Sequence, residues 1–420
     1  MNELPFTEDT IIFGLLCLCL GFVFYTSSIK KGFWKKFYSI VPTVLMCYML
    51  PAIMASTGLI KEEASNTYYV ASRYLLPAAL ILMTLSIDLK AIFNLGPKAL
   101  IMFFTGTLGI VIGGPIAILL VSIFSPETVG GADFDAVWRG LATIAGSWIG
   151  GGANQAAMLE VFQYNPKEFS KMVLVDIVMA NLWMAILLLG IGKTKRIDSW
   201  LKADTSSIEA LKIKVSEHTA KIARVTSLHD FMMMLFYAFV GVGIAHFLGH
   251  HFAEFLENTF EVVRNKEKIL SSLGSKFLWM VVFATAIGIG LSFTKAKNYE
   301  GAGASKIGGM FIYILVATIG MKMDLSRVLE NPGLLAVGFI WICIHALLLI
   351  LVAKLIKAPY FFMAVGSQAN VGGAASAPVV AAEFHPSLTS VGILLAVFGY
   401  VVGTAGAYIC ALLMEVASQM

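Results

Sequence analysis

The chain has 420 residues, of which 58% are hydrophobic and 13% are charged, and its mean hydropathy is +0.82. This composition excludes an ordinary soluble protein and predicts a chain that crosses a membrane many times. The net charge of +4 is small for this length, so we attribute it to loops on the inner side of a membrane and expect no nucleic-acid partner. The acidic start, with Glu3, Glu8 and Asp9, lacks the basic region of a cleaved signal peptide.

Ten apolar runs approach the length of about 20 residues that a helix needs to cross a bilayer. Their approximate ranges are 10–28, 38–60, 69–87, 98–124, 171–192, 229–249, 275–293, 306–321, 333–356 and 388–414. The polar stretch from Lys193 to Asp230 separates them into two sets of five and contains a helix-like run over 208–214. We therefore divide the chain into a first membrane repeat (1–192), a cytoplasmic linker (193–228) and a second membrane repeat (229–420).

A glycine-rich polar segment precedes the last span of each set, at about 134–163 and 358–384. The two segments contain Gly146-Ser147-Trp148-Ile149-Gly150-Gly151-Gly152-Ala153-Asn154-Gln155 and Gly366-Ser367-Gln368-Ala369-Asn370-Val371-Gly372-Gly373. Such sequence forms helix poorly and leaves backbone groups that hydrocarbon cannot satisfy, so it must lie inside protein or beside a wet cavity. A matched pair of interrupted segments in two halves is typical of the binding site of a secondary transporter.

The two sets of spans are copies of one unit. Two strings mark the match, Leu85-Ser86-Ile87-Asp88-Leu89 and Met321-Lys322-Met323-Asp324-Leu325. From Gly146 onward a second register holds without a gap, so that Ser147 meets Ser367. Asp88 and Asp324 are expected to cap the short helices that follow them. The stretch from Ser125 to Val137 looks like an insertion in the first copy.

The duplication leaves two main architectures open. If the glycine segments are re-entrant hairpins, each copy has five crossings and the copies are inverted; if they span, each copy has six and the copies are parallel. The hairpin arrangement puts about 19 Lys and Arg inside and 11 outside, whereas twelve spans give about 14 and 16. The charge count therefore favours hairpins. A third option is an unwound helix that crosses its partner.

We accordingly predict an all-α membrane protein built from two inverted structural repeats. Each repeat has about five transmembrane helices plus one glycine-rich re-entrant or broken helix. The expected location is the inner (plasma) membrane, with the N- and C-termini outside, because the basic loops gather on the other side.

The glycine segments supply the candidate binding site. Broken helices expose carbonyl groups to a cation and half-helix N-termini to an anionic group. The residues that we expect to bind ion or solute here are Ser147, Gly151, Gly152, Asn154, Gln155, Ser367, Gln368, Asn370, Gly372, Gly373 and Ser376. Close packing of helices would explain the glycines, but it would not explain the amides among them. We further expect the amides of Asn154 and Asn370 to face a central cavity from opposite sides.

Asp176 lies inside an apolar span, where a carboxylate is costly and marks a functional site by default. It is a candidate Na⁺ ligand, and Asn181, five residues later, could share the site. The alternative is that Asp176 reaches water from near the start of its helix.

No catalytic group is evident, and no cofactor is expected beyond Na⁺ or H⁺ as the coupling ion. We interpret His345 as the partner in a hydrogen bond between helices.

At these residues the chain resembles the YjcL-like family of bacterial integral membrane proteins, a family of unknown function. The two glycine segments are the most specific part of the resemblance. More distantly, the layout is similar to that of the sodium:glutamate and sodium:citrate symporters and of the cation-antiporter and bile-acid transporter group. Those families imply inverted repeats, a scaffold domain, a moving transport domain and often a homodimer. The chain departs from the proton antiporters, because Asp176 has no acidic neighbour to form their typical carboxylate pair.

These observations predict a secondary active transporter rather than an enzyme. The expected activity is Na⁺-coupled symport of a small, carboxylate-bearing organic solute by alternating access. The alternative is cation/proton antiport through Asp176. The expected partners are the solute, the lipid bilayer and a second copy of the chain.

Overall fold

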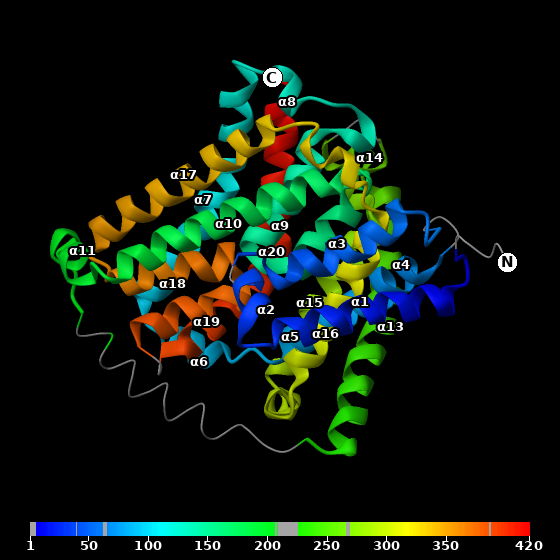
Figure 1. Cartoon of the computed structure of the whole chain (residues 1–420), viewed down its shortest axis with the longest axis horizontal. Helices are drawn as coiled ribbons and strands as arrows, with labels where there is room; N and C mark the ends of the chain where they lie inside the picture. The colour runs from blue at the N-terminus through cyan, green and yellow to red at the C-terminus, as the bar shows by residue number, and fades with distance from the viewer. Residues whose placement is uncertain are drawn as a thin grey trace.

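The chain folds as an assembly of helices (Figure 1). The computed structural model describes residues 6–38, 40–61, 65–205, 208, 226–265, 269–385 and 388–420. Within these residues the regular elements are helical, apart from an isolated bridge between Phe6 and Ile60. The helix-like run expected over 208–214 lies, except for Ile208, outside the described residues.

Eight helices in the described part of the chain are long and apolar enough to cross a membrane. They are α1 (Asp9–Ser27), the continuous helix Thr67–Leu85, α7 (Pro97–Ser122), α10 (Phe169–Ile191), α13 (Leu228–Thr259), α16 (Ala304–Lys322), α17 (Gly333–Ile356) and α20 (Thr389–Ser418). Each coincides with an expected span. The other two expected spans are the shorter helices α3 (Thr43–Ser56) and α15 (Lys276–Ser292).

Two of the expected basic loops are short helices. α2 (Gly32–Tyr38) is bent by 99° from α3, and the 3₁₀ helix η5 (Lys295–Ala302) is bent by 96° from α15. Helices at about a right angle to a span lie across its end. The basic residues of these segments therefore gather beside the ends of spans, where charged side chains can reach polar surroundings.

The helices pack into two bundles, and each half of the chain contributes equally to both. The first three spans of each half pack mainly against one another; we call these the flanking bundle, which comprises α1, α3, Thr67–Leu85, α13, α15 and α16. The last two spans of each half enclose the glycine segments; we call these spans and segments the hairpin bundle, with spans α7, α10, α17 and α20. In Figure 1, α17 and α10 cross the upper left of the molecule, while α1, α13 and α16 lie in the lower right.

Asp88 and Asp324 cap the short helices that lead from one bundle to the other, as predicted. The Asp88 carboxylate accepts a hydrogen bond of 2.9 Å from the backbone N–H of Ala91 in α6 (Leu89–Phe93). The Asp324 carboxylate accepts one of 2.9 Å from the backbone N–H of Ser326 in η6 (Leu325–Leu329). Each cap satisfies a helix N–H that would otherwise lack a partner.

The molecule has two opposite faces at the ends of its spans. At one face α1 begins, where the Asp9 carboxylate accepts a hydrogen bond of 2.8 Å from the backbone N–H of Asn66 beside the start of Thr67–Leu85. We call this the N-terminal face. At the other face α11 (Thr194–Leu201) begins the linker and the Thr226 hydroxyl, near the end of the linker, donates to the carbonyl of Ala302 at 2.9 Å. We call this the linker face.

Candidate binding site

The first glycine segment forms α9 (Val137–Val161), which doubles back in its middle. Gly150 and Gly151 leave the helical conformation, and Gly151 has a φ of 70°. The rings of Trp138 and Phe162 come within 5.5 Å, and Arg139 Nη1 donates to the carbonyl of Phe162 at 2.6 Å. A straight helix would hold residues 24 positions apart at about 36 Å. This segment is therefore a re-entrant hairpin, hairpin 1, whose two arms leave the membrane at one face.

The second glycine segment is also a hairpin, formed by α18 (Tyr360–Val371) and α19 (Gly373–Phe384). Its break lies at Gly372 and Gly373, and Gly373 has a φ of 54°. The rings of Tyr360 and Phe384, at the outer ends of the two arms, are 5.7 Å apart. The backbone N–H of Tyr360 donates to Asp198 in α11 at 2.7 Å. This segment, hairpin 2, therefore opens at the linker face.

The tips of the two hairpins touch inside the hairpin bundle. A Cβ atom added to Gly373 would lie 3.8 Å from the Cα atom of Gly151. Glycine is required at both tips, because a positive φ is strained for other residues. Gly150 is also crowded, since an added Cβ would lie 2.8 Å from the Cα atom of Gly403 in α20. Gly152 is less confined and faces Ile312 of α16 at an ordinary contact distance of 3.7 Å.

Asp176 of α10 holds hairpin 1 in place. Its Oδ1 accepts a hydrogen bond of 2.7 Å from Trp148 Nε1, and its Oδ2 accepts one of 2.9 Å from Gln155 Nε2. The hydroxyl of Ser147 also hydrogen-bonds to this carboxylate. The hydroxyl of Tyr48, in α3 of the flanking bundle, donates to Gln155 Oε1 at 3.3 Å. One buried carboxylate thus accepts from both arms of hairpin 1, and Gln155 joins this network to the other bundle.

Neutral groups hold hairpin 2 at the matching position. Ser367 Oγ accepts a hydrogen bond of 2.7 Å from Trp183 Nε1 of α10 and lies 2.8 Å from His345 Nε2 of α17. His345 Nδ1 lies 2.9 Å from the carbonyl of Gly106, which can only accept, so Nδ1 carries the proton and Nε2 accepts from Ser367. The expected hydrogen bond between helices at His345 is therefore confirmed.

The amides of Asn154 and Asn370 are fully buried and bonded to helices. Each donates at 2.9 Å to the carbonyl four positions before it in its own hairpin. Asn154 Oδ1 accepts from the Thr404 hydroxyl of α20 at 2.6 Å, and Asn370 Oδ1 accepts from the Thr107 hydroxyl of α7 at 2.8 Å. The structure therefore places both amides against the walls of the hairpin bundle.

Gln368 has an incomplete set of hydrogen bonds beside the break in hairpin 2. Its Nε2 donates to Ser376 Oγ at 2.7 Å across the break, while its Oε1 is buried without a partner among the described residues. Gln368 is 1% exposed. Asn181 lies apart from both networks, because it is exposed and donates to the carbonyl of Ile177 on its own helix at 2.8 Å.

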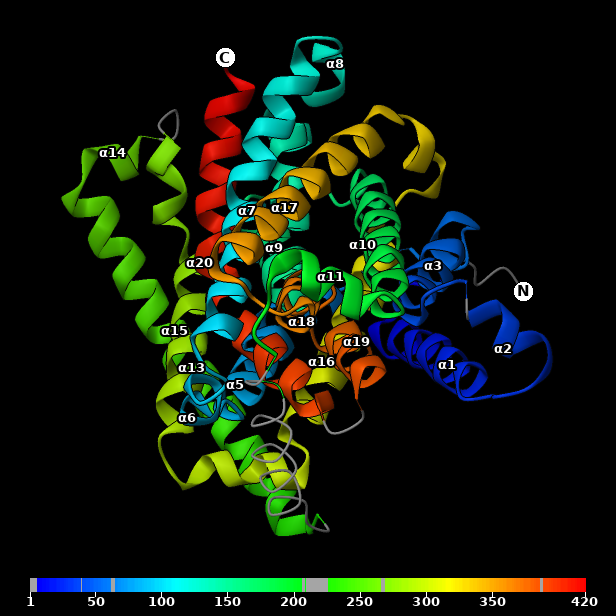
Figure 2. The same ribbon diagram turned by 90° about the vertical axis from the view of Figure 1, so that its left-hand side faces the viewer.

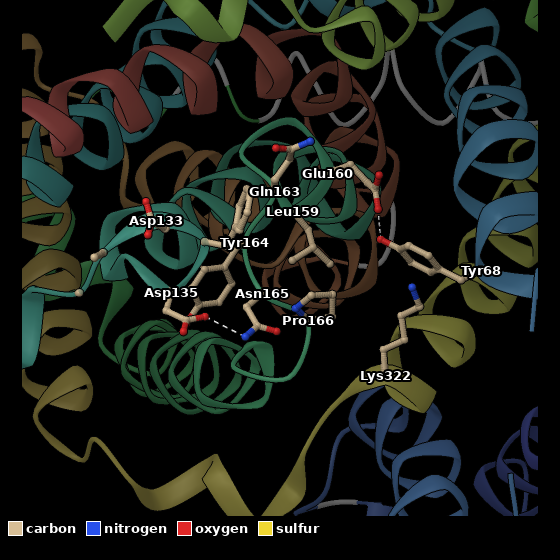
Figure 3. Close-up of a pocket in the computed structure, with 13 residues that line it drawn as sticks. Tyr68, Asp133, Asp135, Leu159, Glu160, Gln163, Tyr164, Asn165, Pro166 and Lys322 are labelled. Carbon is tan, nitrogen blue, oxygen red and sulfur yellow. Dashed lines mark hydrogen bonds between the residues drawn. The ribbon is translucent and has the colours of Figure 1, made fainter. Parts of the chain in front are cut away.

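Two cavities flank the end of hairpin 1 at the N-terminal face. The first, of about 930 Å³, has Tyr68, Glu160 and Lys322 in its wall (Figure 3). The second, of about 870 Å³, lies between the two bundles and is lined partly by α14 (Glu261–Arg264) and η4 (Ile269–Gly274). Both cavities include Asp133, Phe134 and Gln163 in their lining.

Several residues in these networks were missed from the sequence. They are Tyr48, Thr107, Trp148, Trp183 and Thr404. A tryptophan deep in a span carries an indole N–H that needs an acceptor, so Trp148 and Trp183 could have been flagged as members of buried polar networks. The tyrosine and the threonines carry no such signal in the sequence.

The apolar helices, the bundle packing and the buried hairpins define a multi-pass helical membrane protein. The chain belongs to the DUF819 family, described as a protein of unknown function, and the match covers residues 14–417. It is 24% identical over 399 residues to the uncharacterized membrane protein YjcL of Bacillus subtilis (strain 168), covering 91% of this chain and 93% of that protein. The resemblance to the YjcL-like family is thereby confirmed.

Proposed function

We propose that this protein is a secondary active transporter that carries out Na⁺-coupled symport of a small carboxylate-bearing solute by alternating access. The observation that carries the proposal is the contact between the glycine tips of the two hairpins, at Gly151 and Gly373. Each tip combines the C-terminal carbonyls of one helical arm with the N-terminal N–H groups of the next. Carbonyl groups suit a cation, and helix N-termini suit a carboxylate.

We further propose that the two halves are inverted repeats and that the N-terminal face is outside the plasma membrane. In support, hairpin 1 opens at the N-terminal face whereas hairpin 2 opens at the linker face. Each half also contributes three spans to the flanking bundle, and two spans and a hairpin to the hairpin bundle. The flanking bundle would be the fixed part, and the hairpin bundle would move against it.

Cation/proton antiport is the second candidate, because Asp176 is a buried carboxylate within a span. Its two oxygens already accept from Trp148 and Gln155, which supports a role in holding hairpin 1. Proteoliposomes loaded with a pH dye distinguish the two candidates. Alkalinisation of the interior on addition of Na⁺, absent in Asp176→Asn, would favour antiport.

The test of symport is uptake by proteoliposomes from a panel of radiolabelled carboxylic acids, amino acids and dipeptides. We expect uptake of at least one carboxylate, which collapses when the Na⁺ gradient is dissipated. Equal uptake under gradients of any monovalent cation would reject Na⁺ as the coupling ion. Absence of both uptake and counterflow for the whole panel, with a protein that melts cooperatively, would reject the transporter.

A further inference from the structure

A carboxylate of one bundle is bound by the other bundle at the N-terminal face. Glu160, at the end of hairpin 1, places Oε2 at 2.7 Å from Nη2 of Arg73. The Tyr68 hydroxyl donates to Glu160 Oε1, and the Lys322 ammonium lies 4.0 Å from the centroid of the Tyr68 ring (Figure 3). Tyr68, Arg73 and Lys322 all belong to the flanking bundle. We call these three residues the entry site.

The entry site is held in place by the flanking bundle itself. Arg73 lies in the π-helical turn Ala71–Leu75, a kind of turn that often marks functional sites. Its guanidinium lies 4.4 Å over the ring of Phe277, and its carbonyl is 2.8 Å from His246 Nε2. These contacts do not involve Glu160, so the site can keep its shape when the carboxylate leaves.

The ion pair at the entry site is partly shielded from water. The side chain of Glu160 is 14% exposed and that of Arg73 is 27% exposed. A shielded pair with a second hydrogen bond to the carboxylate is stronger than a typical surface pair. The contact therefore contributes to holding the end of hairpin 1 against the flanking bundle.

Space for a solute lies on both sides of this contact. Tyr68, Glu160 and Lys322 line the cavity of about 930 Å³, and Arg73 lines the cavity of about 870 Å³. A small organic acid occupies less space than either cavity. A solute could thus place its carboxylate on the entry site while the rest of the molecule stays in a cavity.

We propose that the entry site is the first binding site for the carboxylate of the solute, and that Glu160 occupies it in the absence of solute. An arriving carboxylate takes the place of Glu160 on Arg73 and Tyr68, and hairpin 1 is then free to move from the flanking bundle. This inference rests on the proposed transport of a carboxylate solute. It assigns recognition at the N-terminal face to residues distinct from those at the hairpin tips.

Thiol labelling of a buried position in the cavity wall tests this inference without any transport measurement. Leu159 lines the larger cavity and is 2% exposed, so a Leu159→Cys variant in a chain without its five native cysteines reports movement of hairpin 1. The purified full-length protein is labelled with a water-soluble thiol reagent. The probes are glutarate and its neutral analogue glutaramide.

We expect glutarate, but not glutaramide, to raise the labelling rate of this variant several-fold. Adding Glu160→Gln should raise the basal rate roughly tenfold, as expected for loss of one ion pair of moderate strength. It should also remove most of the response to glutarate, because the site is then already vacant. Arg73→Gln should raise the basal rate and abolish the response.

Asp133→Asn is the matched control, because Asp133 lines both cavities but makes no contact with the entry site. It should label and respond like the parent. Equal labelling of the parent and Glu160→Gln, or an equal response to glutarate and glutaramide, would overturn the inference. A normal glutarate response in a protein that fails the proteoliposome test would support the entry site as a carboxylate-binding site and reject the proposed transport.

Discussion

The two hairpins share a backbone design but are held in different ways. Hairpin 1 donates to the carboxylate of Asp176 and is joined to the flanking bundle through Glu160. Hairpin 2 is held by the neutral pair of Ser367 and His345, and Glu383 at its outer end is exposed, with no ion pair among the described residues. Figure 2 shows α18 and α19 of hairpin 2 below α9 of hairpin 1.

This difference distinguishes two roles, shaping a hairpin and holding it in place, which the similarity of the two glycine segments in the sequence does not distinguish. The glycine break gives both hairpins their shape, and that part is common to the two halves. Asn154 and Asn370 also make equivalent hydrogen bonds in the two hairpins. The anchoring groups differ, because a carboxylate accepts from hairpin 1 and a neutral histidine accepts from hairpin 2. Charged hydrogen bonds are about twice as strong as neutral ones, so hairpin 1 is the more firmly fixed of the two.

We expect the largest effect on stability from substitutions of the glycines at the hairpin tips. Gly150→Ala should destabilise the protein by about 3 kcal/mol, because the new Cβ would collide with Asn154 Nδ2 and lie 2.8 Å from Gly403 Cα. Gly373→Ala should cost about 1–2 kcal/mol, from its positive φ alone. Thermal melting in detergent measures both losses, and Gly152→Ala, whose Cβ would make only an ordinary contact with Ile312, is the control. Equal losses at Gly150 and Gly373 would show that the two tips are equally confined.

The next largest effect is expected at the two side chains that hold the hairpins, Asp176 and Ser367. Asp176→Asn should cost about 2–3 kcal/mol, because an amide cannot accept all the hydrogen bonds that the carboxylate accepts in a buried site. Ser367→Ala removes neutral bonds only and should cost about 1 kcal/mol. Melting temperatures of the two variants, compared with the parent, rank the anchors. A larger loss at Ser367 would contradict the stronger hold on hairpin 1.

The two glutamines give a smaller and sharper contrast. Gln155→Leu removes the donor to Asp176 Oδ2 and the acceptor of the Tyr48 hydroxyl, and should cost about 1–3 kcal/mol. Gln368→Leu removes one neutral hydrogen bond, from Nε2 to Ser376, and an oxygen that has no donor among the described residues, so its stability should change by less than about 1 kcal/mol. Chemical unfolding in detergent compares the two variants. A loss in Gln368→Leu as large as that in Gln155→Leu would contradict this contrast.

The smallest effect concerns the cap at Asp324. Hydrogen bonding by Ser326 holds the pKa of this carboxyl below its ordinary value of 3.8. Because this pKa is lower in the folded state, the ionised carboxylate stabilises the folded state at pH values above 3.8. This contribution is lost as the pH falls below about 4. Asp324→Ala should therefore cost about 0.5–1 kcal/mol at pH 7 and less at pH 3. A melting difference that persists unchanged at pH 3 would exclude the charged cap.

The sequence predicted the features that depend on local chemistry. Hydropathy located the spans, and the aspartate caps followed from side-chain chemistry. The glycine segments and the distribution of lysine and arginine predicted hairpins, and contacts such as that between Trp138 and Phe162 bear this out. Each of these predictions requires only neighbours along the chain or the general cost of placing polar groups in a bilayer.

The orientation of individual side chains could not be predicted in this way. Asn154 meets Thr404, 250 residues later, and Asn370 meets Thr107, 263 residues earlier. Such partners depend on how the spans assemble around each hairpin, and a partial rotation of one helix about its axis would replace them. Asn181 illustrates the same limit, because five helical positions carry it to a different side of α10 from Asp176.

The stretch between α7 and α9, which the sequence comparison predicts to be an insertion, forms part of the cavity walls at the N-terminal face. This stretch, Ser125 to Val137, includes α8 (Pro126–Val129) and η3 (Asp133–Asp135), and residues of η3 line both cavities. In the proposed transport, a wall of this kind would change the height of the barrier that a solute crosses from that side, and thus a rate. It cannot change the final ratio of concentrations across the membrane, which depends on the gradients. Shortening this loop should therefore alter the speed of proposed transport in both directions alike, and leave the accumulation at steady state unchanged.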